Sequence, residues 1–231
     1  MQHIWDAAKG HVVGDVNLEG DEIVARHSHE RNRHGDKHIR SELIYTRVER
    51  DEVEEFEYRF LLSGNLNDKE TIIFQFHDHW DIPPGITIEG KQFLYAKVAP
   101  PICFMIIEDD LFVRYAVATS HPLLNLEQKW LEFNYSVESF FYRKIVLGEP
   151  ITLNFRVKWS AAPNGYFKSR ELNILNMATM YNNRTPIIQC GLYGSGYCDD
   201  GITVNRIQNL AISKLHEDTS AHFIRTAAED Y

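Results

Sequence analysis

The chain has 231 residues, 44% of them hydrophobic and 12% aromatic, and a formal net charge of −9 at pH 7. This composition excludes a disordered chain, and the length suits one large domain with a sizeable core. The acidic balance argues against nucleic-acid binding, which usually requires a basic surplus. No apolar run approaches the roughly 20 residues that cross a bilayer, and no signal peptide is visible at the start. Residues 26–50 are locally basic, which leaves room for an anionic ligand.

Short β-rich runs separated by turn residues recur along the whole chain. They predict strands at 22–25, 39–48, 56–62, 72–77, 92–98, 102–107, 112–118, 151–159, 166–172, 187–193 and 203–213. One segment, 123–133, has a loosely helical spacing of apolar residues. Strands with no long helices between them predict an all-β chain, folded as one two-sheet sandwich or jelly roll over residues 1–231.

Three of these strands carry polar residues on one face, because side chains two apart along a strand share a face. The polar residues are His38, Arg40 and Glu42 in the first strand, Gln75, His77 and His79 in the second, and Gln189 and Tyr193 in the third. The opposite positions are apolar, namely Ile39 and Leu43, then Ile72, Phe74 and Phe76, then Ile188, Cys190 and Leu192. A face of Arg, Gln, His and Tyr is poor material for a core, so we interpret it as the lining of a groove.

The three cysteines leave two alternatives open. Cys190 and Cys198 are close enough in sequence to pair while Cys103 stays free, or all three are free thiols.

The same three strands carry short motifs, Arg40-Ser41-Glu42-Leu43, Gln75-Phe76-His77 and Gly191-Leu192-Tyr193. Their order and wide spacing resemble the jelly-roll polysaccharide lyases, the group of the family 7 alginate lyases, heparin lyase I and the glucuronan lyases. The resemblance spans roughly residues 36 to 212. It implies a concanavalin A-like sandwich with a concave substrate groove, and an extracellular, monomeric enzyme that acts on an acidic polysaccharide without a metal or cofactor.

Two departures from that group bear on the substrate. Alginate lyases usually have a second Arg where this chain has Ile44, and a Lys where it has Gln189. Both changes remove positive charge that would hold uronates. We therefore expect a glucuronate-containing polymer rather than alginate.

The implied chemistry is β-elimination at a uronate, which explains why these residue types are needed. Donors to the substrate carboxylate stabilise the charge that develops when the C5 proton leaves; Arg40 suits this role through its bidentate fork, and Gln75 adds an amide donor. His77 is a suitable base. Tyr193 can protonate the leaving O4 and, near Arg40, could act as the base too. Glu42 would hold the Arg40 guanidinium.

Further substrate contacts are expected from His38, which could supply the base instead, from Gln189 and His79, and from Lys168 and Arg170 on alternate positions of one strand. Three rival functions stay open. A lectin would use the same face without a base. A metal enzyme on a double-stranded β-helix would use His79 and Asp81 with a distant His. A glycoside hydrolase would use Glu49, Asp51 and Glu54, although that charged stretch is typical of a turn.

Overall fold

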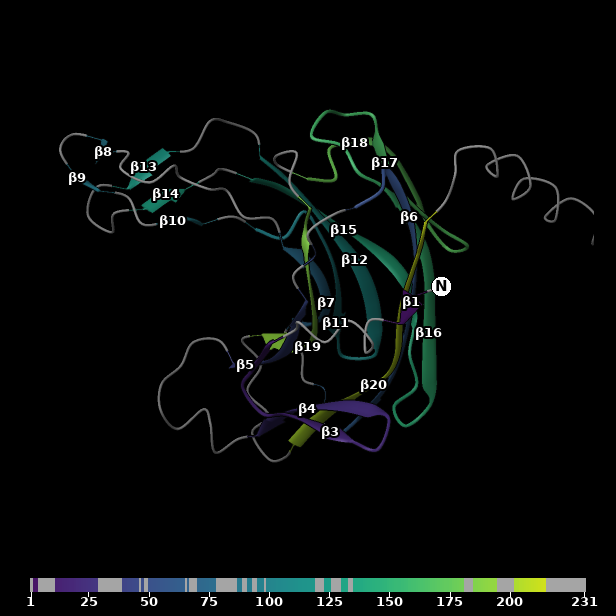
Figure 1. Cartoon of the computed structure of the whole chain (residues 1–231). Coiled ribbons are helices and arrows are strands. Elements are labelled where there is room, and N and C mark those ends of the chain that lie inside the picture. The colour runs from purple at the N-terminus through teal and green to yellow at the C-terminus, as the bar shows by residue number, and fades with distance from the viewer. Residues whose placement is uncertain are drawn as a thin grey trace, which may run out of the picture.

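The structure is a computed structural model that describes residues 2–3, 11–28, 39–45, 47, 50–64, 66, 70–77, 87–88, 91–92, 95–97, 99–118, 123–125, 130–132, 135–180, 185–194 and 202–214. Two large antiparallel sheets pack face to face (Figure 1). The predicted all-β, two-sheet jelly-roll sandwich is confirmed.

The eight-stranded sheet forms one layer. Its order is β18 (Asn173–Met177), β17 (Gly165–Ser169), β16 (Pro150–Lys158), β6 (Val53–Ser63), β20 (Ile202–Lys214), β4 (Glu22–Ser28) and β3 (Val16–Glu19), and β1 (Gln2–His3) also pairs with β20.

The seven-stranded sheet forms the other layer and contains all three motif strands. Its order is β15 (Tyr135–Lys144), β12 (Asp110–Ala118), β11 (Ile102–Ile107), β7 (Thr71–His77), β19 (Ile187–Gly194), β5 (Ile39–Tyr45) and β2 (His11–Val13). The motif strands β7, β19 and β5 are therefore direct neighbours.

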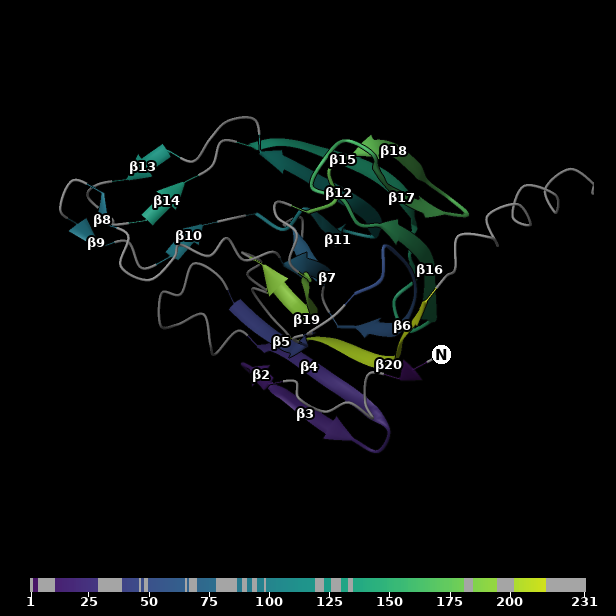
Figure 2. The same ribbon diagram turned by 45° about the horizontal axis from the view of Figure 1, so that its top comes forward.

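Two small sheets complete the fold. They consist of β10 (Tyr95–Lys97), β14 (Trp130–Glu132) and β13 (Leu123–Asn125), and of β8 (Thr87–Ile88) and β9 (Lys91–Gln92). Figures 1 and 2 both show them on the side of the seven-stranded sheet that faces away from the eight-stranded sheet.

The core between the two large sheets follows from strict alternation along the strands. In β16, Ile151, Leu153 and Phe155 are buried while Thr152 and Asn154 are exposed. Aromatic rings fill the middle of the core: Phe56 stacks on Phe155 with ring centroids 5.2 Å apart, and Phe76 meets Trp159 edge to face at 4.8 Å. Each fully buried ring of this kind stabilises the fold by about 1.5–3 kcal/mol.

The expected helix in segment 123–133 is wrong. The described parts of that segment are β13 and β14, which pair antiparallel with Leu124 opposite Leu131. Apolar residues spaced over so short a segment fit a cross-strand pair as well as a helical face, and periodicity alone does not separate the two.

Cys103 and Cys190 are free, buried thiols. The state of Cys190 decides against the Cys190–Cys198 bond; Cys198 itself lies outside the described residues. Burial raises the pKa of Cys103 to about 11 and also raises the pKa of Cys190.

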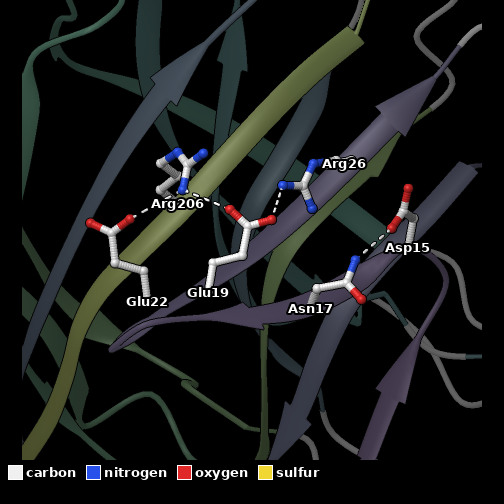
Figure 3. Close-up of polar contacts among 6 residues, drawn as sticks. All are labelled: Asp15, Asn17, Glu19, Glu22, Arg26 and Arg206. Atoms are coloured by element: carbon white, nitrogen blue, oxygen red, sulfur yellow. Dashed lines mark hydrogen bonds and ion pairs between the residues drawn. The ribbon is translucent and has the colours of Figure 1, made fainter.

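Charged side chains cover the solvent side of β3, β4 and β20 (Figure 3). Glu19 forms an ion pair with Arg26, and Arg206 Nη1 lies 3.1 Å from Glu19 Oε2 and 3.3 Å from Glu22 Oε2. The Arg26 hydrogen bond is the main reason that the pKa of Glu19 is lowered. Arg26, which contributes to the basic stretch in the sequence, is therefore balanced by an acid of its own sheet.

No helix in the described part of the chain has the length and apolarity needed to cross a membrane.

Candidate active site

The polar side chains predicted for one face do share a face, the one that the seven-stranded sheet turns away from the core; we call it the outer face. Phe74, Phe76, Ile188, Cys190 and Leu192 all belong to the core. The residues between them therefore point outward. Cross-strand pairing places Tyr193 opposite Arg40, Gln189 opposite Gln75, and Gly191 opposite Glu42.

One residue departs from the predicted alternation. Ile72 was expected on the core side with Phe74, but it packs with Cys103, Met105 and Tyr193 in a separate apolar cluster. The cause is a register shift: Phe74 and Ile72 pair with consecutive residues of β11, so Ile73 is an extra residue on β7. The extra residue reverses the alternation, so Ile72, which precedes Ile73, points to the outer face.

Glu42 is the buried centre of the site. Its Oε1 accepts a hydrogen bond of 2.7 Å from Gln75 Nε2, and its Oε2 lies 3.1 Å from Arg40 Nε. β19 runs between β5 and β7, so the Glu42–Gln75 bond crosses β19 at Gly191, which has no side chain to obstruct it. Burial outweighs the attraction of Arg40 and raises the pKa of Glu42 to about 7.

Arg40 and Tyr193 form the solvent-facing part of the site. The Arg40 guanidinium carbon lies over the Tyr193 ring, 4.6 Å from its centroid. About a third of the Arg40 side chain is exposed, and Tyr193 is partly exposed. A cation thus lies against the face of a phenol ring at the solvent-facing part of the site.

Gln75 and Gln189 lie beneath this surface. Gln75 is 1% exposed and Gln189 4%. Gln75 Nε2 donates to Glu42 and also, over 2.9 Å, to Gln189 Oε1. Both amide hydrogens of Gln75 are therefore used within the protein. In this arrangement Gln75 supports Glu42, whereas the sequence suggested a direct donor to substrate.

His77 is on the outer face but at some distance from Tyr193. It pairs with Ile187, whereas Tyr193 pairs with Ile72. At about 3.3 Å per residue, the Cα atoms of Ile72 and His77 are on the order of 15 Å apart. The register does not bring His77 and Tyr193 side by side. This matters for their predicted roles as base and acid, because both side chains would have to reach the same sugar.

The structure does not bring Lys168 and Arg170 to this face. Lys168 lies in β17 of the eight-stranded sheet, opposite Arg156, and its Nζ sits 4.4 Å from the Tyr166 ring centroid. Its neighbour Phe167 points into the core, so Lys168 points away from both the core and the outer face. Arg170 is in the turn that follows β17. His38 and His79 lie outside the described residues.

Sequence reasoning missed Arg114 on the outer face. Arg114 of β12 pairs with Cys103 of β11, and Cys103 pairs with Gln75, so the three continue the polar row across the sheet. Arg114 Nη1 lies 3.0 Å from Glu70 Oε2. The signal was available in the alternation of strand 112–118, but a single Arg in an otherwise apolar strand did not mark a site.

The rival hydrolase hypothesis finds little support among the described residues, which do not include Glu49, and the metal hypothesis is not tested, because the two residues it rests on are not described. Glu54 is buried, accepts two hydrogen bonds of 2.7 Å from Arg47 Nη1, and accepts another of 2.7 Å from Trp159 Nε1. It is thus a structural carboxylate that faces no solvent. Within the described ranges, no three His, Cys, Asp or Glu side chains gather as a metal site would require, and His79 and Asp81 lie outside those ranges.

The sequence matches no protein-family model and no curated protein. Solved structures do match. A glucuronan lyase from the fungus Trichoderma reesei has a TM-score of 0.61 at 18% identity, covering 90% of this chain and 88% of that one. Alginate lyase A1-II′, of polysaccharide lyase family 7, has a TM-score of 0.55 at 11% identity, covering 88% and 84%. An alginate lyase from Pseudomonas aeruginosa has a TM-score of 0.54 at 15% identity, covering 89% of this chain and 88% of that one.

At these identities the likeness shows the fold, which is the jelly roll of these polysaccharide lyases over about nine tenths of the chain.

Proposed function

We propose that the protein is a polysaccharide lyase that cleaves a uronate-containing acidic polysaccharide by β-elimination. Two independent observations support this. Solved structures of the same fold include a glucuronan lyase and alginate lyases. The outer face presents a cation and a phenol in contact, Arg40 and Tyr193, with Glu42 behind them. The contact between Arg40 and Tyr193 carries the proposal.

In the proposed reaction, Arg40 binds the carboxylate of the uronate and stabilises the enolate-like charge that develops there. The C5–H bond breaks, the C4=C5 double bond forms, and the C4–O4 bond breaks. The proton that leaves C5 is replaced by one delivered to O4, so no water is consumed. Glu42 fixes the Arg40 guanidinium, and Gln75 fixes Glu42.

We assign both proton transfers to Tyr193. In this assignment the Tyr193 oxygen takes the proton from C5 and gives it to O4, while the Arg40 guanidinium in contact with the same ring holds the uronate carboxylate next to that oxygen. His77, farther along β7, then contacts another part of the chain of sugars. One solved structure of alginate lyase A1-II′ is a variant with a histidine and a tyrosine replaced, in complex with substrate. It supports testing both residue types here.

The proposed substrate contains glucuronate rather than mannuronate or guluronate. The outer face has Ile44 and the buried Gln189 at positions where a second Arg and a Lys would add charge. The solved structure with the TM-score of 0.61 is a glucuronan lyase, which supports glucuronate as the sugar. Because polymers of this kind occur outside cells, we propose an extracellular site of action.

The test is a panel of glucuronan, heparin, heparan sulfate, hyaluronan, alginate and ulvan, followed by ultraviolet absorbance. Elimination conjugates the new C4=C5 bond with the carboxylate, which gives an absorbance that hydrolysis cannot produce. We expect it to rise with glucuronan most strongly. New reducing ends without the absorbance would identify a hydrolase, and binding without any product would identify a lectin.

A further inference from the structure

The strand that carries Tyr193 is irregular directly before Tyr193. In the pairing of β19 with β7, Cys190 lies opposite Phe74 and Tyr193 opposite Ile72. Gly191 and Leu192 therefore face the single residue Ile73, which is a β-bulge. Ladder hydrogen bonds are interrupted at a bulge, so its backbone carbonyls need other donors when they are buried.

Buried side chains from the opposite sheet bond to all three residues of this bulge. Asn205 Nδ2 of β20 donates to the Gly191 carbonyl over 2.7 Å. The Tyr58 hydroxyl of β6 donates to the Ile73 carbonyl over 3.2 Å, and accepts a hydrogen bond of 3.1 Å from Asn205 Nδ2. Tyr58 and Asn205, which are hydrogen-bonded to each other, thus bind the backbone of both strands of the bulge, β7 and β19.

His27 completes the set from β4. Its Nε2 lies 2.8 Å from the Leu192 carbonyl. A carbonyl only accepts, so this ring nitrogen carries the hydrogen. Tyr58 and Asn205 are fully buried and His27 is 6% exposed. We call these three side chains the core bridge.

The core bridge needs an explanation, because the sandwich core around it is apolar and aromatic. Buried polar groups add little net stability over apolar side chains of the same shape, but they are costly when mismatched. They therefore penalise a wrong register. A slip of β19 by one residue would turn Gln189, Gly191 and Tyr193 into the core and remove the bonds of Asn205 and His27 to β19.

The geometry points to the core bridge as a positioning device for Tyr193. Tyr58, Asn205 and His27 hold the bulge from behind, and the bulge sets the direction in which Tyr193 leaves β19 toward Arg40. The same anchor keeps Gly191 beneath the Glu42–Gln75 bond. The inference rests on the proposed function, since it assigns positioning residues for that elimination. None of the three contacts substrate.

The test is Tyr58→Phe, which keeps the ring and removes one hydroxyl. It leaves the Ile73 carbonyl without its donor and Asn205 without one acceptor. A displacement near 1 Å can cost about a hundredfold in rate, and we expect kcat on the best polymer to fall at least about tenfold while KM changes less than about twofold. Asn205→Leu should have the same effect or a larger one.

The matched control is Tyr142→Phe. Tyr142 is also a buried core tyrosine, but its hydroxyl hydrogen-bonds Ser169, far from the bulge. Both Tyr→Phe variants lose one hydroxyl with two hydrogen-bond partners, Ile73 and Asn205 for Tyr58 and Ser169 and Glu171 for Tyr142, so their global stabilities measured in urea should fall by similar amounts. Only Tyr58→Phe should lose kcat. Equal kcat in the two variants would overturn the positioning role.

Amide hydrogen exchange at residues 191–193 gives a readout that needs no activity. We expect faster exchange there in Tyr58→Phe and unchanged exchange in Tyr142→Phe. If wild type cleaves no polymer, the proposed function fails, yet this exchange difference still decides whether the core bridge holds the bulge. Unchanged exchange in Tyr58→Phe would exclude the bridge whatever the activity.

Discussion

Tyr193 is the residue on which the proposed chemistry depends most directly. Tyr193→Phe removes one oxygen and keeps the ring that lies against Arg40 and the Ile72 cluster. We expect kcat to fall by at least the ~100-fold typical of losing a general acid. Oligosaccharide affinity should survive, because the hydroxyl acts mainly in the transition state.

His77→Ala measured alongside Tyr193→Phe separates two mechanisms. Because the register keeps His77 away from Tyr193, we expect its loss to raise KM more than it lowers kcat. A collapse of kcat equal to that of Tyr193→Phe would instead make His77 the base. Near-normal turnover by Tyr193→Phe would contradict the catalytic role of Tyr193 and would assign the proton transfers to another group.

The raised pKa of Glu42 predicts an unusual pH dependence of the free energy of unfolding. Its pKa in the folded protein is raised from the ordinary 4.5 to about 7, mainly by burial. A raised pKa means that the folded state holds the proton more tightly than the unfolded state. The stabilising contribution is complete below about pH 4.5 and is lost as the pH rises through 7, by an amount on the order of 3 kcal/mol.

Urea unfolding of wild type and Glu42→Gln at pH values from 4 to 8 measures this contribution. The amide mimics the neutral carboxyl, so the variant should gain stability relative to wild type as the pH rises. A constant difference across this range would mean that the carboxylate is ionised throughout and held by Arg40. Activity serves as a separate readout, because a neutral residue at 42 also loosens the guanidinium.

At the scale of single residues, the sequence predicted which side chains point outward but not what they do there. Alternation was enough to place Arg40, Glu42, Gln75 and Tyr193 on one face. The roles of the two glutamines depend on which strands are neighbours and in what register. Only that register shows that the amide hydrogens of Gln75 are spent on Glu42 and Gln189.

At the scale of elements, the sequence predicted the central strands and missed the edges. β2, β15, β3 and β18 were not expected, and these are the outermost strands of the two large sheets. A central strand has a hydrogen-bonded neighbour on each side and buries most of its apolar side chains, which gives a strong apolar signal. An edge strand has one side in solvent and tolerates polar residues on it, so its pattern is weak.

Gly191 is the position where one element constrains its two neighbours. Its φ is 147°, and a Cβ there would lie 2.2 Å from the Ser41 carbonyl oxygen and 2.8 Å from Glu42 Cα. Both atoms belong to backbone, which cannot rotate away. We expect Gly191→Ala to separate β19 from β5, with a loss of stability of roughly 1–3 kcal/mol or more.

The measurement for Gly191→Ala is thermal unfolding, with activity at a temperature where the variant is still folded. Gly148→Ala is a suitable control, because that glycine also has a positive φ, 83°, but has open space around it. The control should lose some stability through backbone strain and keep its kcat. If Gly191→Ala behaves like the control, the close approach of β19 to β5 is wrong.

The whole molecule carries a net charge of −9, although the proposed substrate is a polyanion. Fields beyond about 8 Å are screened at physiological salt, so capture depends on contacts with cations such as Arg40. We expect KM to rise with salt above that level while kcat changes little. A KM that falls with salt would show that repulsion by the net charge controls binding.

Cys103 and Cys190, the two cysteines among the described residues, are poor targets for thiol reagents in the folded protein. Only the thiolate reacts, and burial keeps Cys103 and Cys190 protonated at ordinary pH. Modification at Cys190 therefore requires β19 to leave the sheet, and modification at Cys103 requires β11 to do so. Site-resolved alkylation followed by mass spectrometry would time these two openings separately. The chain thus contains its own pair of reporters on whether the site strand opens before the rest of its sheet.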